Sequence, residues 1–415
     1  MKTNLLAMSL LLLTGLVIFS YTTIQNSDTS APPLPLQSIL LQPDPVQPVP
    51  VQPDPVHQAK GPGIELVFAL DTTGSMDGLI GAAKEKIWSI ASSMINTSPA
   101  PQIKIGLVAY RDKGDDYITR IIPLSDDLDK VYAQLLALEA AGGGDTPESV
   151  NSALDDAINR INWSHSQSDF KAIFLIGDAP GHLDYPEETP FQVSLKQAKE
   201  KGIIVNTIQA GADPITHHQW QTIAALGGGA KFQVNQQGNS VAITTPFDET
   251  IAKASRELDA THLYFGDSTT QKQAQILLQQ REKVYRESSS AALARRAKYK
   301  ATTGHKNKLD ETHDLVTEIS GKRISLSAIP AESLPPEIQT MTANEQQAFI
   351  QQKASLRAQI ELRLSQLTQQ RDSYIAAQLK GQVDLDKSLD HQLLSTLQTQ
   401  AQTKGFDYRH TNLDY

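Results

Sequence analysis

Residues 61–263 alternate between two hydrophobic patterns, and this alternation constrains the fold more than any other feature of the chain. Runs that are apolar throughout are typical of strands buried on both faces, and they are separated by longer runs with helical spacing. The strand-like runs are 64–70, 103–111, 118–123, 171–177, 203–210 and, more weakly, 231–234. The helix-like runs are 79–95, 126–141, 147–161, 189–201, 217–226 and 246–263. We therefore predict an α/β fold, a doubly wound and mostly parallel sheet, in which 103–111 and 118–123 form one antiparallel hairpin.

The composition excludes several classes of function. The chain has 415 residues, of which 40% are hydrophobic and 20% charged, with a formal net charge of −9. A negative balance argues against non-specific nucleic-acid binding, which needs a basic face. There is no cysteine, so disulfides, thiolate nucleophiles and cysteine zinc sites are impossible. The sequence also contains no phosphate-binding Gly-Lys-Ser/Thr loop, no Gly-x-Ser-x-Gly elbow and no His-Glu-x-x-His helix.

Polar side chains with oxygen donors follow the first predicted strand. Asp71, Thr73 and Ser75 come directly after the apolar run 64–70. Ligands of open α/β sheets bind at the carboxyl ends of strands, which is where this turn is expected. Carboxylate and hydroxyl oxygens suit hard cations, although short polar side chains also cap helices.

Two later stretches supply similar groups. Thr146 lies in a glycine-rich loop, 142–148, and Pro147 is well suited to the first position of the following helix. Asp178 follows the strand-like run 171–177. Five oxygen donors on three loops at one sheet edge exceed what helix capping requires, so we predict a metal site there.

The order of these motifs resembles the metal-ion-dependent adhesion site of von Willebrand factor type A domains. The resemblance covers residues 61–263 and implies a metal site formed by Asp71, Thr73, Ser75, Thr146 and Asp178. The family usually has serine where Thr73 stands; threonine keeps the hydroxyl but adds a methyl group and a stiffer χ1. The implied cofactor is Mg²⁺, with Mn²⁺ or Ca²⁺ as alternatives.

The resemblance implies a protein-binding module rather than an enzyme, because an Asp or Glu of a protein partner completes the metal shell in this family. An alternative is a metal-dependent hydrolase or phosphoryl-transfer enzyme at the same site. That chemistry needs a general base near the metal, and the candidates are His182 and Asp184. We interpret His182 first as a partly exposed loop histidine. A structural stalk protein is a third hypothesis.

The N-terminal region has two parts. Residues 1–25 hold one cation, Lys2, and an apolar run from Leu5 to Tyr21, which is typical of a signal peptide or of an N-terminal membrane anchor. Residues 26–60 are proline-rich, which predicts an extended linker without a folded core. We expect an exported protein that is anchored to the membrane and faces the periplasm or cell exterior, or is secreted if the signal is cleaved.

Residues 264–415 are richer in glutamine, serine, alanine and charge, and they predict a helical tail. Residues 269–300 are expected to form one helix. A second amphipathic helix follows Pro335 and Pro336, with an apolar stripe that can fold back on 269–300 or self-associate as a short coiled coil. The stripe consists of Phe349, Leu356, Ile360, Leu364 and Leu367. A Leu-Pro-Pro-Glu stretch, here Leu334 to Glu337, followed by a long helix also resembles the tails of some bacterial relatives.

Overall fold

The computed structural model describes residues 62–95, 97, 101–144, 146–236, 243–301, 308–379 and 389–408. The predicted N-terminal segment, 1–25, and the proline-rich linker, 26–60, lie outside these residues and remain predictions. Among the described residues, no helix combines the length and apolar composition that crossing a bilayer requires.

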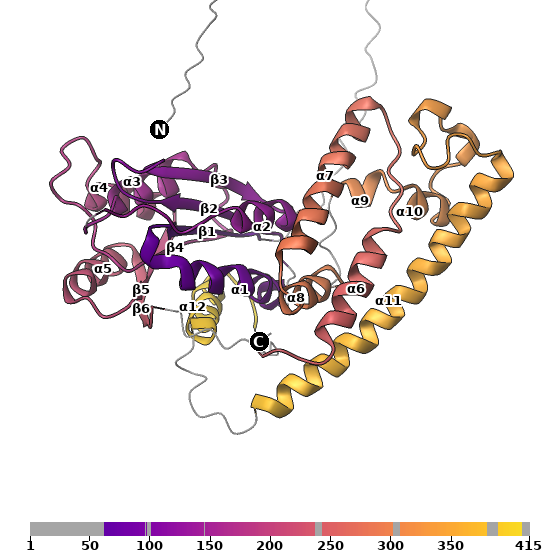
Figure 1. Ribbon diagram of the computed structural model, residues 1–415. Helices are drawn as coiled ribbons and strands as arrows, with labels where there is room; N and C mark the ends of the chain where they lie inside the picture. Colours follow the sequence, from indigo (N-terminus) through magenta and orange to yellow (C-terminus); the bar gives the residue numbers. More distant parts are fainter. Residues whose placement is uncertain are drawn as a thin grey trace, which may run out of the picture. The chain divides into compact units, whose positions relative to one another are not determined.

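A six-stranded sheet forms the centre of the α/β region (Figure 1). Its order is β3-β2-β1-β4-β5-β6, and every neighbouring pair is parallel except β2 and β3. The strands are β1 (Ile64–Asp71), β2 (Ile103–Tyr110), β3 (Thr119–Ser125), β4 (Phe170–Gly177), β5 (Ile203–Ala210) and β6 (Gly228–Val234). The predicted fold class and the antiparallel hairpin are confirmed.

Helices cover both faces of the sheet (Figure 1). The first face carries a short turn and two helices: η1 (Gly74–Met76), α1 (Asp77–Ile95) and α2 (Leu128–Leu136). The second carries α3 (Val150–Asp155) with its π-helical extension (Asp156–Arg160), α4 (Phe191–Glu200) and α5 (Pro214–Leu226). The prediction that Pro147 starts a helix is wrong, because α3 begins at Val150 and the Thr146–Pro147 peptide bond is cis.

The C-terminal helix α12 (Leu389–Gln402) packs on the first face, against α1 and β6 (Figure 1). Leu397 and Phe406 are buried in the same hydrophobic core as α1. The amides of Asn206 in β5 and Gln400 in α12 exchange hydrogen bonds of 2.8 and 3.1 Å. The end of the described chain is therefore part of the core of the α/β region, although α12 begins 155 positions after the end of β6 at Val234.

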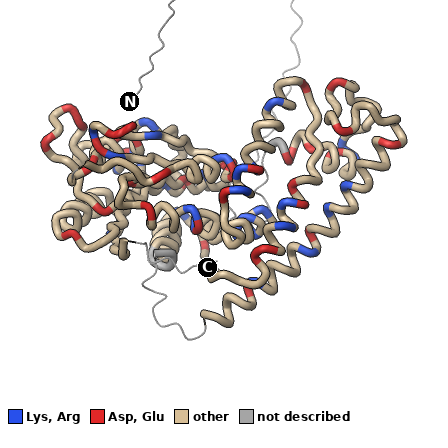
Figure 2. The backbone as a smooth tube through the Cα atoms, viewed as in Figure 1, with Lys and Arg blue, Asp and Glu red and all other residues tan. Residues whose placement is uncertain are grey.

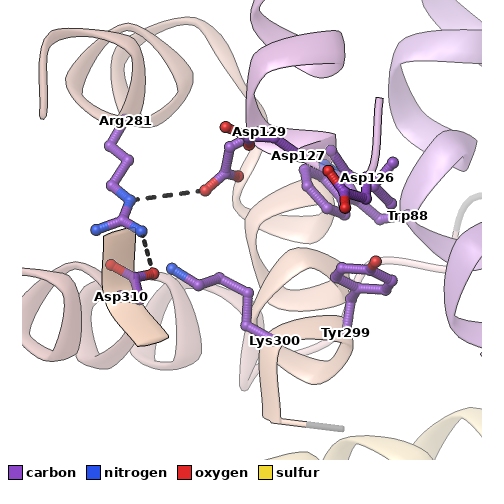
Figure 3. A pocket seen from close by; sticks show the side chains of 9 residues that line it. Trp88, Asp126, Asp127, Asp129, Arg281, Tyr299, Lys300 and Asp310 are labelled. Atoms are coloured by element: carbon purple, nitrogen blue, oxygen red, sulfur yellow. Dashed lines mark hydrogen bonds and ion pairs between the residues drawn. The ribbon is translucent and has the colours of Figure 1, made fainter. Parts of the chain in front are cut away.

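The predicted single helix at 269–300 is two helices, α7 (Ser268–Glu287) and α8 (Ser290–Ala301). Figure 2 shows basic and acidic residues gathered where these helices approach α2. The charged groups are buried and form a network, part of which is seen in Figure 3. Arg296 contacts Asp129 of α2 at 2.5 and 2.7 Å, and Arg281 contacts Asp310 at 2.5 Å. This network joins α7 and α8 to the α/β region.

Two basic residues of α8 share one acidic partner, Asp259, which lies at the end of α6 (Asp248–Asp259). It lies 2.9 Å from Arg296 and 2.5 Å from Lys300. Burial disfavours its charged form, but Lys300, Arg296 and Arg281 outweigh that effect and hold the pKa of Asp259 well below its usual range. The network thus favours the ionised forms of three buried carboxylates, since Asp129 and Asp310 also have lowered pKa values.

The remaining helical region ends in the long helix α11 (Ala343–Leu379). Before it come α9 (Lys308–Thr312), α10 (Leu315–Ser320), η3 (Leu326–Ala328) and η4 (Ala331–Ser333). Thr342 starts α11 as part of a reciprocal cap, because its backbone N–H donates to Glu345 at 2.8 Å and the Glu345 N–H donates back to its hydroxyl at 3.4 Å.

The apolar stripe of α11 packs within the chain, mainly on α6 and α10. Ile360 and Leu364 are buried against Ile251 of α6 and Ala294 and Ala297 of α8. Within the predicted partner, 269–300, α8 packs on α11, while α7 packs on α2. Leu356 is 43% exposed, so its assignment to the buried stripe is wrong.

Candidate metal centre

Three loops meet at the carboxyl edge of the sheet because β1 and β4 are parallel neighbours, with Leu70 paired to Ile176. Asp71 is the last residue of β1, and Asp178 follows the last residue of β4. The third loop, between α2 and α3, carries Thr146. The residues predicted from three separate stretches therefore lie at one edge; their assignment as metal ligands remains a prediction.

Asp71 is fully buried, with 0% exposure. Its Oδ1 accepts hydrogen bonds from the Thr73 backbone N–H at 2.9 Å and from the Thr73 hydroxyl at 2.7 Å. Its Oδ2 has no hydrogen-bond partner in the part of the chain that the structure describes. A buried carboxylate oxygen without a partner is costly, so this atom is well suited to a cation or to a water bound to one.

Thr73, Ser75, Thr146 and Asp178 line a common hollow of about 490 Å³, and Asp71 is hydrogen-bonded to Thr73 of this lining. The Thr73 and Ser75 hydroxyl oxygens are 3.4 Å apart. The backbone of Gly143 packs tightly against Thr73, since a Cβ atom at Gly143 would lie 2.9 Å from the Thr73 side chain. Gly143 has φ +77°, a left-handed conformation that favours glycine, so the glycine-rich loop brings its backbone against the site.

Glu148 is a further carboxylate of the site, and the sequence analysis did not select it. It lines the hollow, it is buried, and its Oε2 has no hydrogen-bond partner among the residues described. Its N–H donates to the Pro180 carbonyl at 2.9 Å, and its carbonyl accepts from His182 at 3.0 Å, which ties two of the three loops together. The only signal in the sequence was its position two residues after Thr146, within the loop already singled out.

The electrostatics of this cluster are those of an acidic site. Burial raises the pKa of Asp71 to about 7, with a further contribution from the charge of Asp178 and opposed by the Thr73 hydrogen bonds. Burial also raises the pKa of Glu148 to about 9, together with the charges of Asp71 and Asp112. A divalent cation would favour the ionised form of each carboxylate.

Gln236, just beyond β6, donates a hydrogen bond from its neutral side-chain amide to Asp178. Its side-chain amide donates to Asp178 Oδ2 at 2.5 Å and to the Ser75 carbonyl at 3.3 Å. This contact satisfies one oxygen of Asp178 and places an amide at the rim of the site. No feature of the sequence pattern pointed to Gln236, because its contact depends on how β6 ends beside β5.

The residues of the hollow fit a hard cation. Their donors are carboxylate and hydroxyl oxygens, and the residues known to line it include no lysine or arginine. Within the described part of the chain, no three or more histidine, aspartate or glutamate residues are grouped so that they could hold a metal ion. A predicted ligand set with only two carboxylates and three hydroxyls does not require such a cluster.

His182 is buried, so the interpretation as a partly exposed loop histidine is wrong. Its ring stacks on Tyr185 with centroids 3.9 Å apart. Its Nδ1 lies 2.8 Å from Asp184, and its Nε2 lies 3.4 Å from Asp112. Neither His182 nor Asp184 is among the residues that line the hollow. These contacts give His182 a packing role and do not favour it as a general base.

The comparisons with known proteins concern the same part of the chain. Residues 65–236 match the family model of the von Willebrand factor A domain. The von Willebrand factor A domain-containing protein 7 of Rattus norvegicus is 36% identical over 97 residues, which cover 23% of this chain and 10% of that protein. The putative ariadne-like RING finger protein R811 of Acanthamoeba polyphaga mimivirus is 27% identical over 119 residues, which cover 29% and 11%. The chain thus spans only about a tenth of these curated relatives.

Solved structures give weaker matches. Proximal thread matrix protein 1 from the mussel byssus, in a form with a zinc-occupied MIDAS motif, is 13% identical with a TM-score of 0.33, and the match covers 42% of each chain. The SpRpn10 VWA domain is 14% identical with a TM-score of 0.33, and the match covers 42% of this chain and 88% of that one.

Proposed function

We propose, for a chain whose residues 65–236 belong to the von Willebrand factor A domain family, that the carboxyl edge of the sheet binds a divalent cation and, through it, an acidic side chain of a protein partner. Asp71, Thr73, Ser75, Thr146 and Asp178 would hold the cation, with Glu148 beside them. Mg²⁺ is the cation we propose first, because all donors are hard oxygens.

The observation that carries this proposal is the pair of buried carboxylate oxygens without partners among the described residues, Asp71 Oδ2 and Glu148 Oε2. Glu148 lines the hollow, Asp71 is hydrogen-bonded to Thr73 of its lining, and the neighbouring charges are also negative. Burying such groups without compensation destabilises a fold, and a cation compensates both at once. This arrangement supports a cation site better than it supports simple capping of α1.

The cation would supply a positive charge at the floor of an open hollow. Hydroxyl ligands are neutral, so only Asp71 and Asp178 would oppose the charge of the cation, and a carboxylate that acts through a bound water offsets that charge less than a direct ligand does. A carboxylate from a partner protein would gain electrostatic energy in a partly dry site. Export and attachment to the membrane are also proposals. They rest on the sequence of residues 1–25, which lie outside the described chain.

Calorimetry with Mg²⁺ on the full chain tests the proposal. Binding to the folded state raises the melting temperature, and ligand at a hundredfold excess over Kd adds about 2.7 kcal/mol of stability. Asp71→Asn should abolish both the heat of binding and the rise in melting temperature while keeping the side-chain volume. Asp77→Asn, an exposed aspartate in the first turn of α1, is the matched control and should bind like the wild type.

Equal Mg²⁺ binding by wild type and Asp71→Asn would show that the site is misassigned. Asp71→Ala should give the same loss as Asp71→Asn, which separates loss of the ligand from the effect of one particular replacement.

A further inference from the structure

An apolar groove of about 510 Å³ lies next to the hollow. One wall is the loop after β4, which carries Leu183, and the other is the first half of α5, with Pro214, Ile215 and His218. Phe191, the first residue of α4, is also part of the lining. Leu183 is 73% exposed and Ile215 is 68% exposed, which is high for large apolar side chains.

The two walls are tied together by hydrogen bonds, so the groove is formed before anything enters it. The Gln219 side chain accepts from the Gly181 N–H at 2.5 Å and donates to the Gly181 carbonyl at 2.9 Å. The Thr216 hydroxyl lies 3.3 Å from the Asp178 carbonyl, which it can use as an acceptor. A preformed groove costs little ordering when a partner binds, and this favours recognition.

The groove and the hollow share one segment of chain. Asp213 lines the hollow, while the next two residues, Pro214 and Ile215, line the groove. The Asp213 carboxylate caps α5 through the Thr216 N–H at 2.6 Å, so this junction is held in place. The charge changes sharply across it, because the hollow is lined by carboxylates and the groove lining includes no aspartate, glutamate, lysine or arginine among the described residues.

We infer that this groove is the second half of the partner site: it receives a large apolar side chain close in sequence to the acidic residue at the cation. The occupant is therefore a protein segment that combines one Asp or Glu with one large apolar residue, such as Leu, Ile or Phe, a few positions away. The charge pattern selects this occupant. The acidic hollow binds a cation, which then attracts a carboxylate of the partner, whereas the neutral groove favours an apolar side chain. The inference rests on the proposed function and adds a sequence preference for the partner.

The test is selection of a random-peptide phage library on the full chain, with Mg²⁺ and with chelator. Peptides recovered only with Mg²⁺ should share an acidic residue and, a few positions away, a large apolar one. Ile215→Ser and Leu183→Ser should remove the apolar preference and weaken binding of the selected peptides about tenfold, while the acidic preference and Mg²⁺ dependence remain. Leu226→Ser is the matched control: it removes an exposed leucine, 48% accessible, from the other end of α5 and should change nothing.

The two ideas fail in different ways. Mg²⁺-dependent acidic peptides without an apolar preference, or with one that Ile215→Ser leaves intact, would overturn the groove and keep the proposed function. Peptides that bind equally with chelator, or to Asp71→Asn, would overturn the proposed function. Dimerisation of the wild type that Ile215→Ser abolishes would assign the groove to a second copy of the chain and overturn the inference, and recovery of no peptide would count against both.

Discussion

Replacing Arg296 by methionine should destabilise the protein by about 3 kcal/mol, near the low end of the range for breaking a buried ion pair. Arg296 is 0% exposed and lies in α8, where it contacts Asp129 of α2 and Asp259 of α6. Methionine keeps much of the aliphatic volume but removes the charge and all five N–H donors. The substitution therefore tests the buried charge network, of which Figure 3 shows the part around Arg281, rather than the packing around it.

The contacts set the expected magnitude. Without Arg296, the nearest cation to Asp129 is Arg281, whose Nε is 3.7 Å from its Oδ2. Asp259 keeps Lys300 at 2.5 Å and a hydrogen bond from Tyr285 at 2.8 Å. One carboxylate thus loses its main partner and the other stays compensated, which is why we expect the lower part of the usual cost of about 3–5 kcal/mol.

The assay is urea unfolding at neutral pH, followed by tryptophan fluorescence, since Trp88 lines the pocket beside the network (Figure 3). Arg256→Met is the matched control. Arg256 is 60% exposed and pairs with Glu282, which is 54% exposed, so its loss should cost within about 1 kcal/mol. The double variant Asp129→Leu with Arg296→Met should be more stable than the sum of the single losses predicts. An Arg296→Met variant no less stable than Arg256→Met would refute the reasoning.

Two further predictions concern stability. Leu364→Asp should destabilise the chain by no less than the truncation of a buried leucine, which costs about 2–5 kcal/mol. Leu356→Asp should change little, because that side chain is half exposed. Unfolding midpoints and light scattering measure both variants, and a dimer that dissociates on Leu364→Asp would contradict packing within the chain. Stability should also fall in acid: basic neighbours outweigh burial and lower the folded-state pKa of Asp129 and Asp259 below the unfolded value of about 3.9, so their contribution is present above about pH 4 and is lost as pH falls further. Arg296→Met should lose less stability than the wild type between neutral pH and about pH 3, and an equal loss would contradict this.

The α/β architecture could be predicted because its signals are local. Strands β1, β2, β4 and β5 are buried along almost their whole length and mainly apolar, and burial on both faces leaves that pattern in a parallel sheet. Element boundaries were less accurate. The helix expected at 126–141 covers only Leu128–Leu136, because Ala137 closes it with its N–H bonded to Gln134 and Leu135.

Some residues of the candidate site could also be predicted from local sequence, and others could not. Asp71, Thr73, Ser75 and Asp178 could be selected because they directly follow buried strands, and the topology of a parallel sheet brings strand ends to one edge. Glu148 and Gln236 could not, because nothing local distinguishes them from ordinary loop residues. Their roles come from a loop that turns back over Asp71 and from the end of β6 beside Asp178.

By itself, the sequence determined the class of the fold, the edge at which polar groups gather and the chemistry those groups favour, since each depends on spacing within a short stretch. Only the tertiary structure decided how the helices of the second half are used. The contacts of α12 with α1, and of Arg296 with Asp129, join residues more than a hundred positions apart. Such pairings are chosen by which surfaces and charges remain uncompensated once the sheet has formed, and a helix with several apolar faces or several buried charges has no local signal that names its partner.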